Sequence, residues 1–473
     1  MNHKAANIIT NFSYSLGANI ITFIISVIII GIVPKVLGIE EYGYFQLYLF
    51  YTSYAIFFHL GLPNGIYLRY GGKEFSNLNK GLFTMQFWMI TIYALLLAAI
   101  GSMIIVSTLG VEDKGFILIM TCLCGVIIIP RDFILLTLQA TNRIKDYVKA
   151  TIIDRIVFIT LAVVFLILGD RECSLLIKAD IYGKLAALVW LVYHCKDMVF
   201  EKSIKIQQGL QEALKNISSG SKILASNIAD LMIIGIMRMG IENKWDIETF
   251  GKVSLTLSLS NLMMVVINAI SIVIYPMLRR TPQDELSKYY GILRNILMVP
   301  LLGIIVVYYP MKEVLALWLP RYANSLTYMA LLFPICIYES KMSMLVNTYL
   351  KNLRKEKWIL IVNVVSVFIS FIMSLIAIFL LNNLTLTIVS IVLVLAFRCI
   401  FAEIILSKFI NIKVKKDILL ELLMCTIFMT TGWLIRSYFS TLFYAACYLV
   451  YLFIKRKDII EAKQEIKAFA NSQ

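Results

Sequence analysis

Long runs of apolar residues, separated by short polar segments, occupy most of the chain. A helix that crosses a membrane needs roughly 20 mostly apolar residues. The sequence offers fourteen windows near that length, and this pattern predicts an all-α, polytopic membrane protein with about 14 transmembrane helices, the last two of them short. The windows are 10–33, 44–67, 82–109, 116–138, 150–168, 174–195, 217–239, 253–275, 292–310, 325–347, 359–381, 385–407, 418–435 and 441–454.

Composition supports this class. The chain has 473 residues, of which 60% are hydrophobic and 15% charged, whereas soluble domains are about 25% charged. The eight cysteines lie mostly in apolar segments without the spacing of metal ligands, so we expect neither disulfides nor a metal, and no cofactor. The first apolar run is too long for a cleavable signal peptide, and we expect it to remain as a helix.

The distribution of Lys and Arg predicts the orientation, because these residues accumulate on the cytoplasmic side. With the N-terminus inside, the inner connections carry 27 of them and the outer connections 8. Both termini are therefore expected in the cytoplasm, at a bacterial inner membrane. The net charge of +15 follows from this topology, so nucleic acid is not expected as a partner.

The connections are short, and none carries a domain. The longest, residues 196–216, is amphipathic and predicts a helix along the cytoplasmic surface of the membrane. It divides the chain into an N-lobe at 1–195 and a C-lobe at 217–409. Residues 410–473 then hold the last two helices and a basic tail.

A short motif occurs twice, each time between two apolar runs. I-E-x-[YF]-G stands at Ile39 to Gly43 and again at Ile247 to Gly251, 208 residues later. A second echo, at a shift of 210, relates the loop at 142–145 to the loop at 352–355. A chance match that merely suits an outer turn is the simpler interpretation. Together the two echoes favour two parallel six-helix repeats, an arrangement that is typical of alternating-access transporters.

Several segments resemble a known family: "VPKVLGIEEYGYFQLYLF", "HLGLPNGIYLRYGG", "LQATNRIKDY", "SNIADLMIIGIMRMG" and "VIYPMLRR". They are similar to polysaccharide flippases of the multidrug/oligosaccharidyl-lipid/polysaccharide (MOP) exporter superfamily, the O-antigen or capsule type called Wzx. The resemblance runs through the whole chain in short, degenerate motifs. It implies movement of an undecaprenyl-diphosphate-linked oligosaccharide between leaflets by alternating access. It also implies membrane lipids and other polysaccharide-assembly proteins, such as a glycan polymerase, as partners.

Cations inside the predicted spans are candidates for binding a diphosphate head group, because intramembrane charges usually face a cavity or a partner. Four others, Arg155, Lys178, Arg238 and Arg294, lie near helix ends and are expected to reach the membrane surface. The alternative is internal pairing, with Arg131 beside Asp132, Lys341 near Glu339 and Arg398 near Glu403. The candidates for the cationic cleft are Arg131, Lys184, Lys222, Lys341 and Arg398.

Polar residues recur every three or four positions in the first, seventh and eighth windows, so they share one helix face in each. We expect their amides to line a wet cavity, although such residues also hold membrane helices together. The cavity-lining candidates are Asn19, Asn227, Asn261 and Asn268. Asp230 is a candidate for ion coupling or for orienting a cation. His59 is expected to be a buried polar residue, and "GLPNG" at 61–65 to interrupt its helix.

Two other functions remain open. A MATE-like exporter of small organic molecules would share the fold but would be expected to have an acidic cleft. A membrane glycan polymerase or acyltransferase would be expected to have a larger outer domain. No nucleotide-binding motif is present in the sequence, so energy is expected to come from ion gradients or substrate supply. No catalytic step is expected, and the function predicted is a flippase, not an enzyme.

Overall fold

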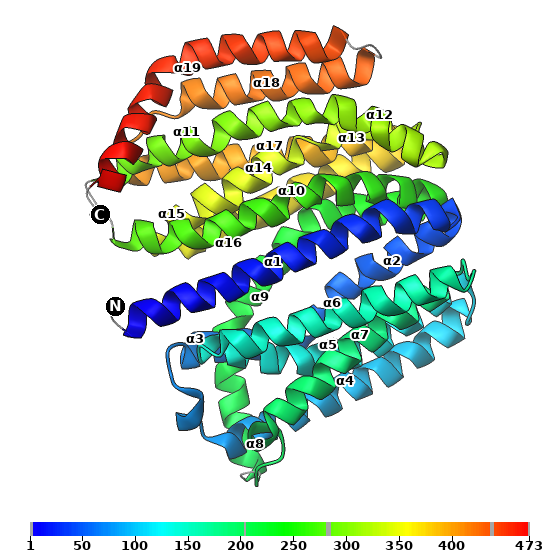
Figure 1. Cartoon of the computed structure of the whole chain (residues 1–473). Helices are drawn as coiled ribbons and strands as arrows, with labels where there is room; N and C mark the ends of the chain where they lie inside the picture. The colour runs from blue at the N-terminus through cyan, green and yellow to red at the C-terminus, as the bar shows by residue number, and fades with distance from the viewer. Residues whose placement is uncertain (1–2, 203–204, 281–284, 436–438, 472–473) are drawn as a thin grey trace. The chain divides into compact units, whose positions relative to one another are not determined.

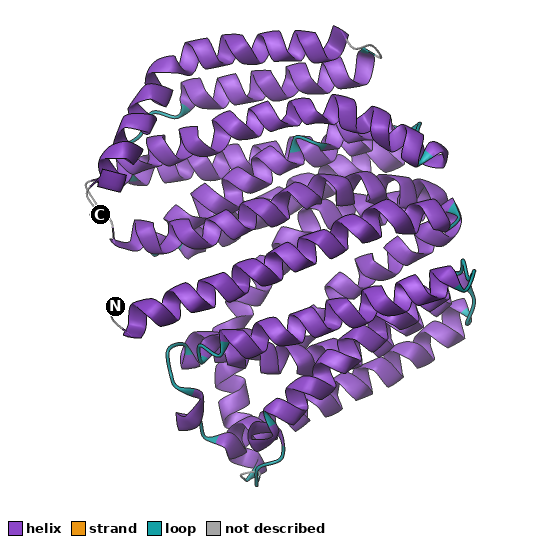
Figure 2. Cartoon of the chain, viewed as in Figure 1, coloured by secondary structure: helices purple, strands orange, loops and turns teal. Residues whose placement is uncertain are grey.

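A computed structural model gives the architecture of the chain. It describes residues 3–202, 205–280, 285–435 and 439–471, with side chains for all of these except 3–16, 18, 263, 265–280 and 465–471. All regular elements in the described residues are helices, and the intervening segments are short loops (Figure 2). The prediction of an all-α protein is confirmed.

The chain forms two compact units, which are described separately. The first unit, Met1–Ile228, is built around α5, which contacts α2, α3, α4, α6 and α7. Its elements are α1 (His3–Val36), α2 (Ile39–Ala55), η1 (Ile56–His59), α3 (Leu62–Tyr70), η2 (Phe75–Asn77), α4 (Lys80–Leu109), α5 (Asp113–Ala140), α6 (Ile144–Ile167), α7 (Cys173–His194), α8 (Lys196–Val199) and the first part of α9 (Ile206–Lys244).

The second unit, Ala229–Gln473, is built around the helical segment Ser325–Asn352, 89% of whose most apolar window is buried. In Figure 1, α18 and α19 lie side by side, and α19 also contacts α11. The elements after α9 are α10 (Ile247–Arg280), α11 (Leu286–Ile304), η4 (Ile305–Val307), α12 (Tyr308–Trp318), η5 (Pro320–Tyr322), η6 (Ser325–Thr327), α13 (Tyr328–Leu332), α14 (Ile335–Ser340), the π-helical η7 (Lys341–Val346), α15 (Asn347–Asn352), α16 (Glu356–Ser374), the π-helical η8 (Leu375–Leu380), α17 (Leu384–Phe409), α18 (Lys415–Leu434) and α19 (Phe439–Asn471).

The predicted windows correspond to helical segments. Each of the fourteen falls on helices of the structure, and in the described residues ten helical segments are long and apolar enough to cross a membrane. Window 44–67 is interrupted where expected, because Leu60 and Gly61 both have positive φ (56° and 81°) between η1 and α3. A multi-pass membrane protein accounts for these segments.

The connection at 196–216 differs from its prediction. Instead of a separate surface helix, residues from Ile206 onward continue into α9, a single helix of 39 residues. No proline lies between 205 and 244 to end it. The division between the two units falls inside α9, after Ile228, so the predicted lobe boundaries remain a prediction.

Helix boundaries recur along the chain. The segment Asp113–Ala140 reappears as Ser325–Asn352, and α6 and α16 begin at Ile144 and Glu356, all at a shift of 212. The preceding turns also agree, because Arg143 N donates to Leu138 O and Lys355 N to Leu350 O, both at 2.8 Å. The register of this second echo is therefore 212, not the predicted 210.

The twice-written motif marks the start of a helix. α2 begins at Ile39 and α10 at Ile247, with acidic residues in both first turns, where the helix dipole favours negative charge. This local role suffices to explain the motif by itself. The recurring boundaries are the stronger support for an internal repeat.

Within the first unit, α3 and α9 approach each other through glycines. A Cβ atom on Gly65 would lie 1.8 Å from the backbone oxygen of Asn216, and one on Gly220 would lie 2.0 Å from that of Gly61. Real Cβ contacts are never this short, so the two backbones can meet only where side chains are absent.

We expect Gly65→Ala to lower the free energy of unfolding by about 1–3 kcal/mol through overpacking. The measurement is thermal unfolding of the purified protein in detergent. Gly291→Ala in α11 is the matched control, because a Cβ there would meet no described atom within 4 Å. An unchanged midpoint for Gly65→Ala would contradict the close approach of α3 and α9.

Candidate functional site

A cavity of about 240 Å³ in the first unit brings two of the predicted cations together. Arg131 of α5 and Lys184 of α7 both line it, although 53 positions separate them in the sequence. Asp132 also contributes to its wall. The full lining is Leu49, Thr52, Ser53, Ile56, Ile128, Arg131, Asp132, Leu135 and Lys184.

Both cations are already paired with carboxylates. Arg131 Nη2 lies 2.7 Å from Asp154 Oδ2 of α6, and Lys184 pairs with Asp180, one turn earlier on α7. Asp180 also accepts a hydrogen bond of 2.7 Å from the Tyr48 hydroxyl. The predicted pairing of Arg131 with Asp132 is wrong, because Asp154 takes that place.

Asp132 is the carboxylate of this cavity that has no Lys or Arg within ion-pair distance among the described residues. Its one ion-pair contact in the described residues is with His59, whose Nε2 lies 3.6 Å from Asp132 Oδ2. Since Arg131 and Lys184 are matched by Asp154 and Asp180, the cluster carries more acidic groups than cations. Of the residues that line the cavity itself, two are cations and one is acidic, and the predicted cationic cleft stays a prediction. His59 is buried, as predicted.

Polar atoms without partners face the same region. Thr52 Oγ1 and Arg131 Nε make no hydrogen bond to any described residue, and Thr52 is 8% exposed. A buried donor or acceptor without a partner costs about 1–3 kcal/mol. The cavity is therefore suited to water or to a polar ligand.

Arg398 of α17 forms a second charged cluster, in the second unit. Its guanidinium pairs with Glu339 of α14 at 2.9 Å and with Asp230 of α9, and its Nε donates to Asn363 of α16 at 3.0 Å. Two carboxylates thus share one cation. Asp230 pairs with Arg398 and its side chain is 48% exposed; its predicted role in ion coupling or in orienting a cation stays a prediction. The predicted partner Glu403 is wrong for Arg398.

Lys341 belongs to a buried network in the same unit. It pairs with Glu421 of α18 at 2.6 Å and with Glu403 of α17, rather than with the predicted Glu339. Arg294 of α11 pairs with the same two glutamates, at 2.8 Å and 3.0 Å. Lys341 is 1% exposed, so this arrangement favours internal pairing over direct contact with a substrate.

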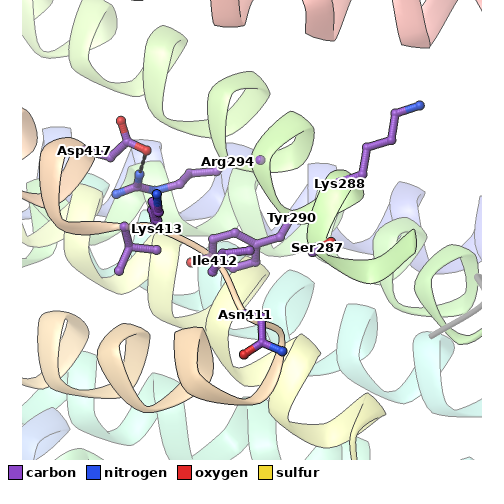
Figure 3. A pocket seen from close by; sticks show the side chains of 10 residues that line it. Ser287, Lys288, Tyr290, Arg294, Asn411, Ile412, Lys413 and Asp417 are labelled. Atoms are coloured by element: carbon purple, nitrogen blue, oxygen red, sulfur yellow. Dashed lines mark ion pairs between the residues drawn. The ribbon is translucent and has the colours of Figure 1, made fainter. Parts of the chain in front are cut away.

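The network continues to the last two helices. Arg294 also pairs with Asp417 of α18, as Figure 3 shows, and Asp417 lies 2.5 Å from Lys455 of α19. Arg294 is 3% exposed. Its predicted reach to the membrane surface is therefore wrong, because three carboxylates hold it inside.

A second cavity, of about 390 Å³, adjoins this network where α11 and α18 begin. Its charged lining residues are Arg294, Asp417, Lys413 and Lys288, and in Figure 3 the side chain of Lys288 points away from Arg294 and Asp417. Because Arg294 already forms ion pairs with three carboxylates, we assign this cavity no ligand.

The remaining predicted residues are dispersed. Lys222 and Asn227 are exposed on α9 and Asn261 on α10, while Asn19 is half-buried on α1. Lys222 forms no ion pair with any residue whose side chain is described. Asn268 lies outside the described side chains. The structure does not gather these residues into one site within either unit.

Sequence reasoning missed Asp154, Asp180 and Glu421, and it assigned Glu339 and Glu403 to the wrong cations. The partners are Asp154, Asp180, Glu339, Glu403 and Glu421, all within predicted spans. Intramembrane acids carry the same cost as intramembrane cations. Counting the acidic residues together with the cations in each predicted span would have shown that the two kinds of charge nearly balance.

Comparison with solved structures decides the fold. The lipid II flippase MurJ in an inward closed conformation superposes with a TM-score of 0.68 at 12% identity, over 96% of this chain and 100% of that one. A MOP superfamily transporter from Pyrococcus furiosus, described as having a binding pocket of reverse polarity, gives 0.52 at 12% identity, over 85% and 95%. MATE in complex with MaD3S gives 0.55 at 14% identity, over 85% and 95%.

This chain shares the fold of these structures. No family model matches the sequence, and no curated protein matches it. The MOP fold accounts for the multi-pass helical architecture, and the family that the sequence resembles lies within this superfamily.

We expect Glu403→Gln to destabilise this MOP-fold protein by about 3–5 kcal/mol, because Arg294 and Lys341 would lose a buried carboxylate that they share. Thermal unfolding in detergent measures the effect. The control is Glu313→Gln, at an exposed position of α12 with no ion pair among the described residues. Equal stability of the two variants would show that the network does not hold the second unit together.

Proposed function

We propose that the chain is a flippase that moves an undecaprenyl-diphosphate-linked oligosaccharide across the bacterial inner membrane by alternating access, for O-antigen, capsule or exopolysaccharide assembly. The observation that carries the proposal is the extent of the match to MurJ, which takes in 96% of this chain. The MATE structures cover only 83–86%. The part they leave out is similar in size to the segment after Phe409, which contains α18 and α19.

These two helices are bound firmly to the rest of the second unit. Lys455 of α19 and Asp417 and Glu421 of α18 all belong to the network around Arg294. A helix pair that needs three buried ion pairs is an integral part of the protein. In the proposed function it serves the lipid portion of the substrate.

The head group is expected to contact cations that are not already neutralised. Lys222 is the best candidate, because it is exposed and forms no ion pair among the described side chains. Asn227 and Asp230 follow on the same helix and offer polar contacts for sugar hydroxyls. Arg131, Lys184 and Arg398 remain in the proposal, but each would have to share its charge between a substrate and a carboxylate.

A second candidate function is a MATE-like, ion-coupled exporter of small organic cations. It is favoured by one observation, the surplus of carboxylates over cations around Asp132 and around Arg398. An exporter would use these acids to bind cationic compounds. An enzymatic function, such as glycan polymerisation or acyl transfer, has no comparable support, because the named structural neighbours are transporters.

The test is surface glycan display in cells that lack their native flippase, complemented with the wild-type chain and with Ala variants of the five predicted cations, Arg131, Lys184, Lys222, Lys341 and Arg398. We expect Lys222→Ala to lower display about tenfold at an unchanged membrane level, the loss of one charge-assisted contact. Lys341→Ala is expected to lower the membrane level itself, because Glu403 and Glu421 would be left unpaired.

Lys178→Ala is the matched control, since Lys178 is also exposed and forms no ion pair with a described residue. It should leave display unchanged. If the wild-type chain restores no glycan while the cognate glycan pathway is present, the flippase proposal fails. Increased resistance of the same cells to cationic compounds would then support the exporter.

A further inference from the structure

The charges around the cavity of the first unit do not balance. Two cations, Arg131 and Lys184, and one carboxylate, Asp132, line it. With Asp154 and Asp180, the partners of the two cations, the group holds three carboxylates and two cations. Arg131 is engaged by Asp154 and Lys184 by Asp180. Asp132 forms no ion pair with any Lys or Arg that the structure describes. An unmatched charge in a medium of low dielectric constant is costly, and such a group tends to neutralise itself.

Protonation of His59 could supply the missing positive charge only by breaking a hydrogen bond. Its Nδ1 accepts the backbone N–H of Gly61 at 2.9 Å, so the ring proton must be on Nε2, which faces Asp132 Oδ2. A second proton would have to go onto Nδ1 and would remove the Gly61 bond. His59 is only 4% exposed. The group able to accept a proton is therefore the carboxylate of Asp132.

Water has a place from which to deliver that proton. Asp132 lines the cavity of about 240 Å³, and so does Thr52, whose hydroxyl oxygen is buried and makes no hydrogen bond to a described residue. A polar cavity with a free hydroxyl and a carboxylate offers the partners that an internal water needs.

We propose that Asp132 is a proton-binding site of this protein. In the proposed step a hydronium ion in the cavity gives a proton to Asp132 Oδ, an O–H bond forms, water is released and the cluster becomes neutral. The inference does not depend on which molecule is transported.

The other groups around Asp132 are accounted for. Tyr147 of α6 lies near it and is neutral, and Tyr48 of α2 is engaged with Asp180. On the remaining helices that pack against α5, Arg69 of α3 pairs with Glu212 and Lys80 of α4 with Asp197. None of these cations lies within ion-pair distance of Asp132. Arg131, the preceding residue on α5, interacts with Asp132 electrostatically, but its ion pair is with Asp154.

Protonation of Asp132 would affect the interruption of the helix between α2 and α3, where Leu60 and Gly61 have positive φ. His59 Nε2 lies 3.6 Å from Asp132 Oδ2, beyond hydrogen-bond distance, so its N–H interacts with a charged carboxylate in one state and with a neutral acid in the other. The electrostatic attraction between the ring N–H and Asp132 is therefore weaker when Asp132 is protonated. Through Nδ1 the same ring holds Gly61, whose backbone oxygen meets α9 at Gly220. The site is thus linked to the position of α3 on α9.

The experiment is difference infrared spectroscopy on the purified full chain in lipid nanodiscs, with the pH stepped from about 8 to about 6, a range in which ordinary exposed carboxyl groups stay ionised. We expect the wild type to show the carbonyl-stretch band of one newly protonated carboxyl group. Asp132→Asn should abolish it. Asp197→Asn, at a half-exposed position on α8, should retain it.

Asp132→Glu guards against a folding defect, since it should keep a band that is shifted in frequency. The proposal is overturned if the wild type shows no band or if the band persists unchanged in Asp132→Asn. A band that disappears when sodium replaces potassium at constant pH would assign the site to a metal cation and would also overturn it. These outcomes require no substrate, so a failure here leaves the flippase proposal standing.

Discussion

The structure depends on the compensation of charge inside helices that are otherwise apolar. Removing an ion from water costs several kcal/mol even after relaxation, and only a well-placed counter-charge offsets that cost. In the second unit Arg294, Lys341 and Lys455 are matched by Glu403, Asp417 and Glu421, and this network joins α11, η7, α17, α18 and α19. Packing among apolar helices in lipid is weakly directional. The ion pairs fix the orientation of the helices, because each helix must place its charged residue in the same network.

The cluster around Asp132 differs from this network in one respect. Asp132 has no Lys or Arg within ion-pair distance among the described residues, whereas each carboxylate of the network has at least one. A network in which every charge is paired stabilises one arrangement of helices, whereas an unpaired carboxylate changes its energy when a proton or a charged ligand arrives. The first kind of site suits a permanent helix contact, and the second suits a protein that must alternate between conformations.

The fold could be predicted largely from the sequence, whereas the charged clusters could not. Span length and apolar content are local properties, so fourteen windows located the helices and "GLPNG" located the break before α3. The ion-pair partners of the cations could not be predicted in the same way. Sequence reasoning paired Arg131 with Asp132 and Lys341 with Glu339, but residues one or two positions apart point to different sides of a helix. The true partners lie 23 positions from Arg131 and 80 from Lys341. Of these ion pairs, only Lys184 with Asp180 joins residues four positions apart on one helix, a spacing from which the pair could have been predicted.

Helix boundaries recur along the chain at two spacings. Ile39 and Ile247 begin helices 208 residues apart, and Ile144 and Glu356 begin helices 212 residues apart. The interval between the two boundaries is therefore four residues longer in the second half of the chain than in the first. Four residues are about 1.1 turns of an α-helix. An insertion of that length inside a helix rotates the residues beyond it by only about 40°, so a membrane helix can lengthen by four residues and keep its charged side chains on nearly the same face.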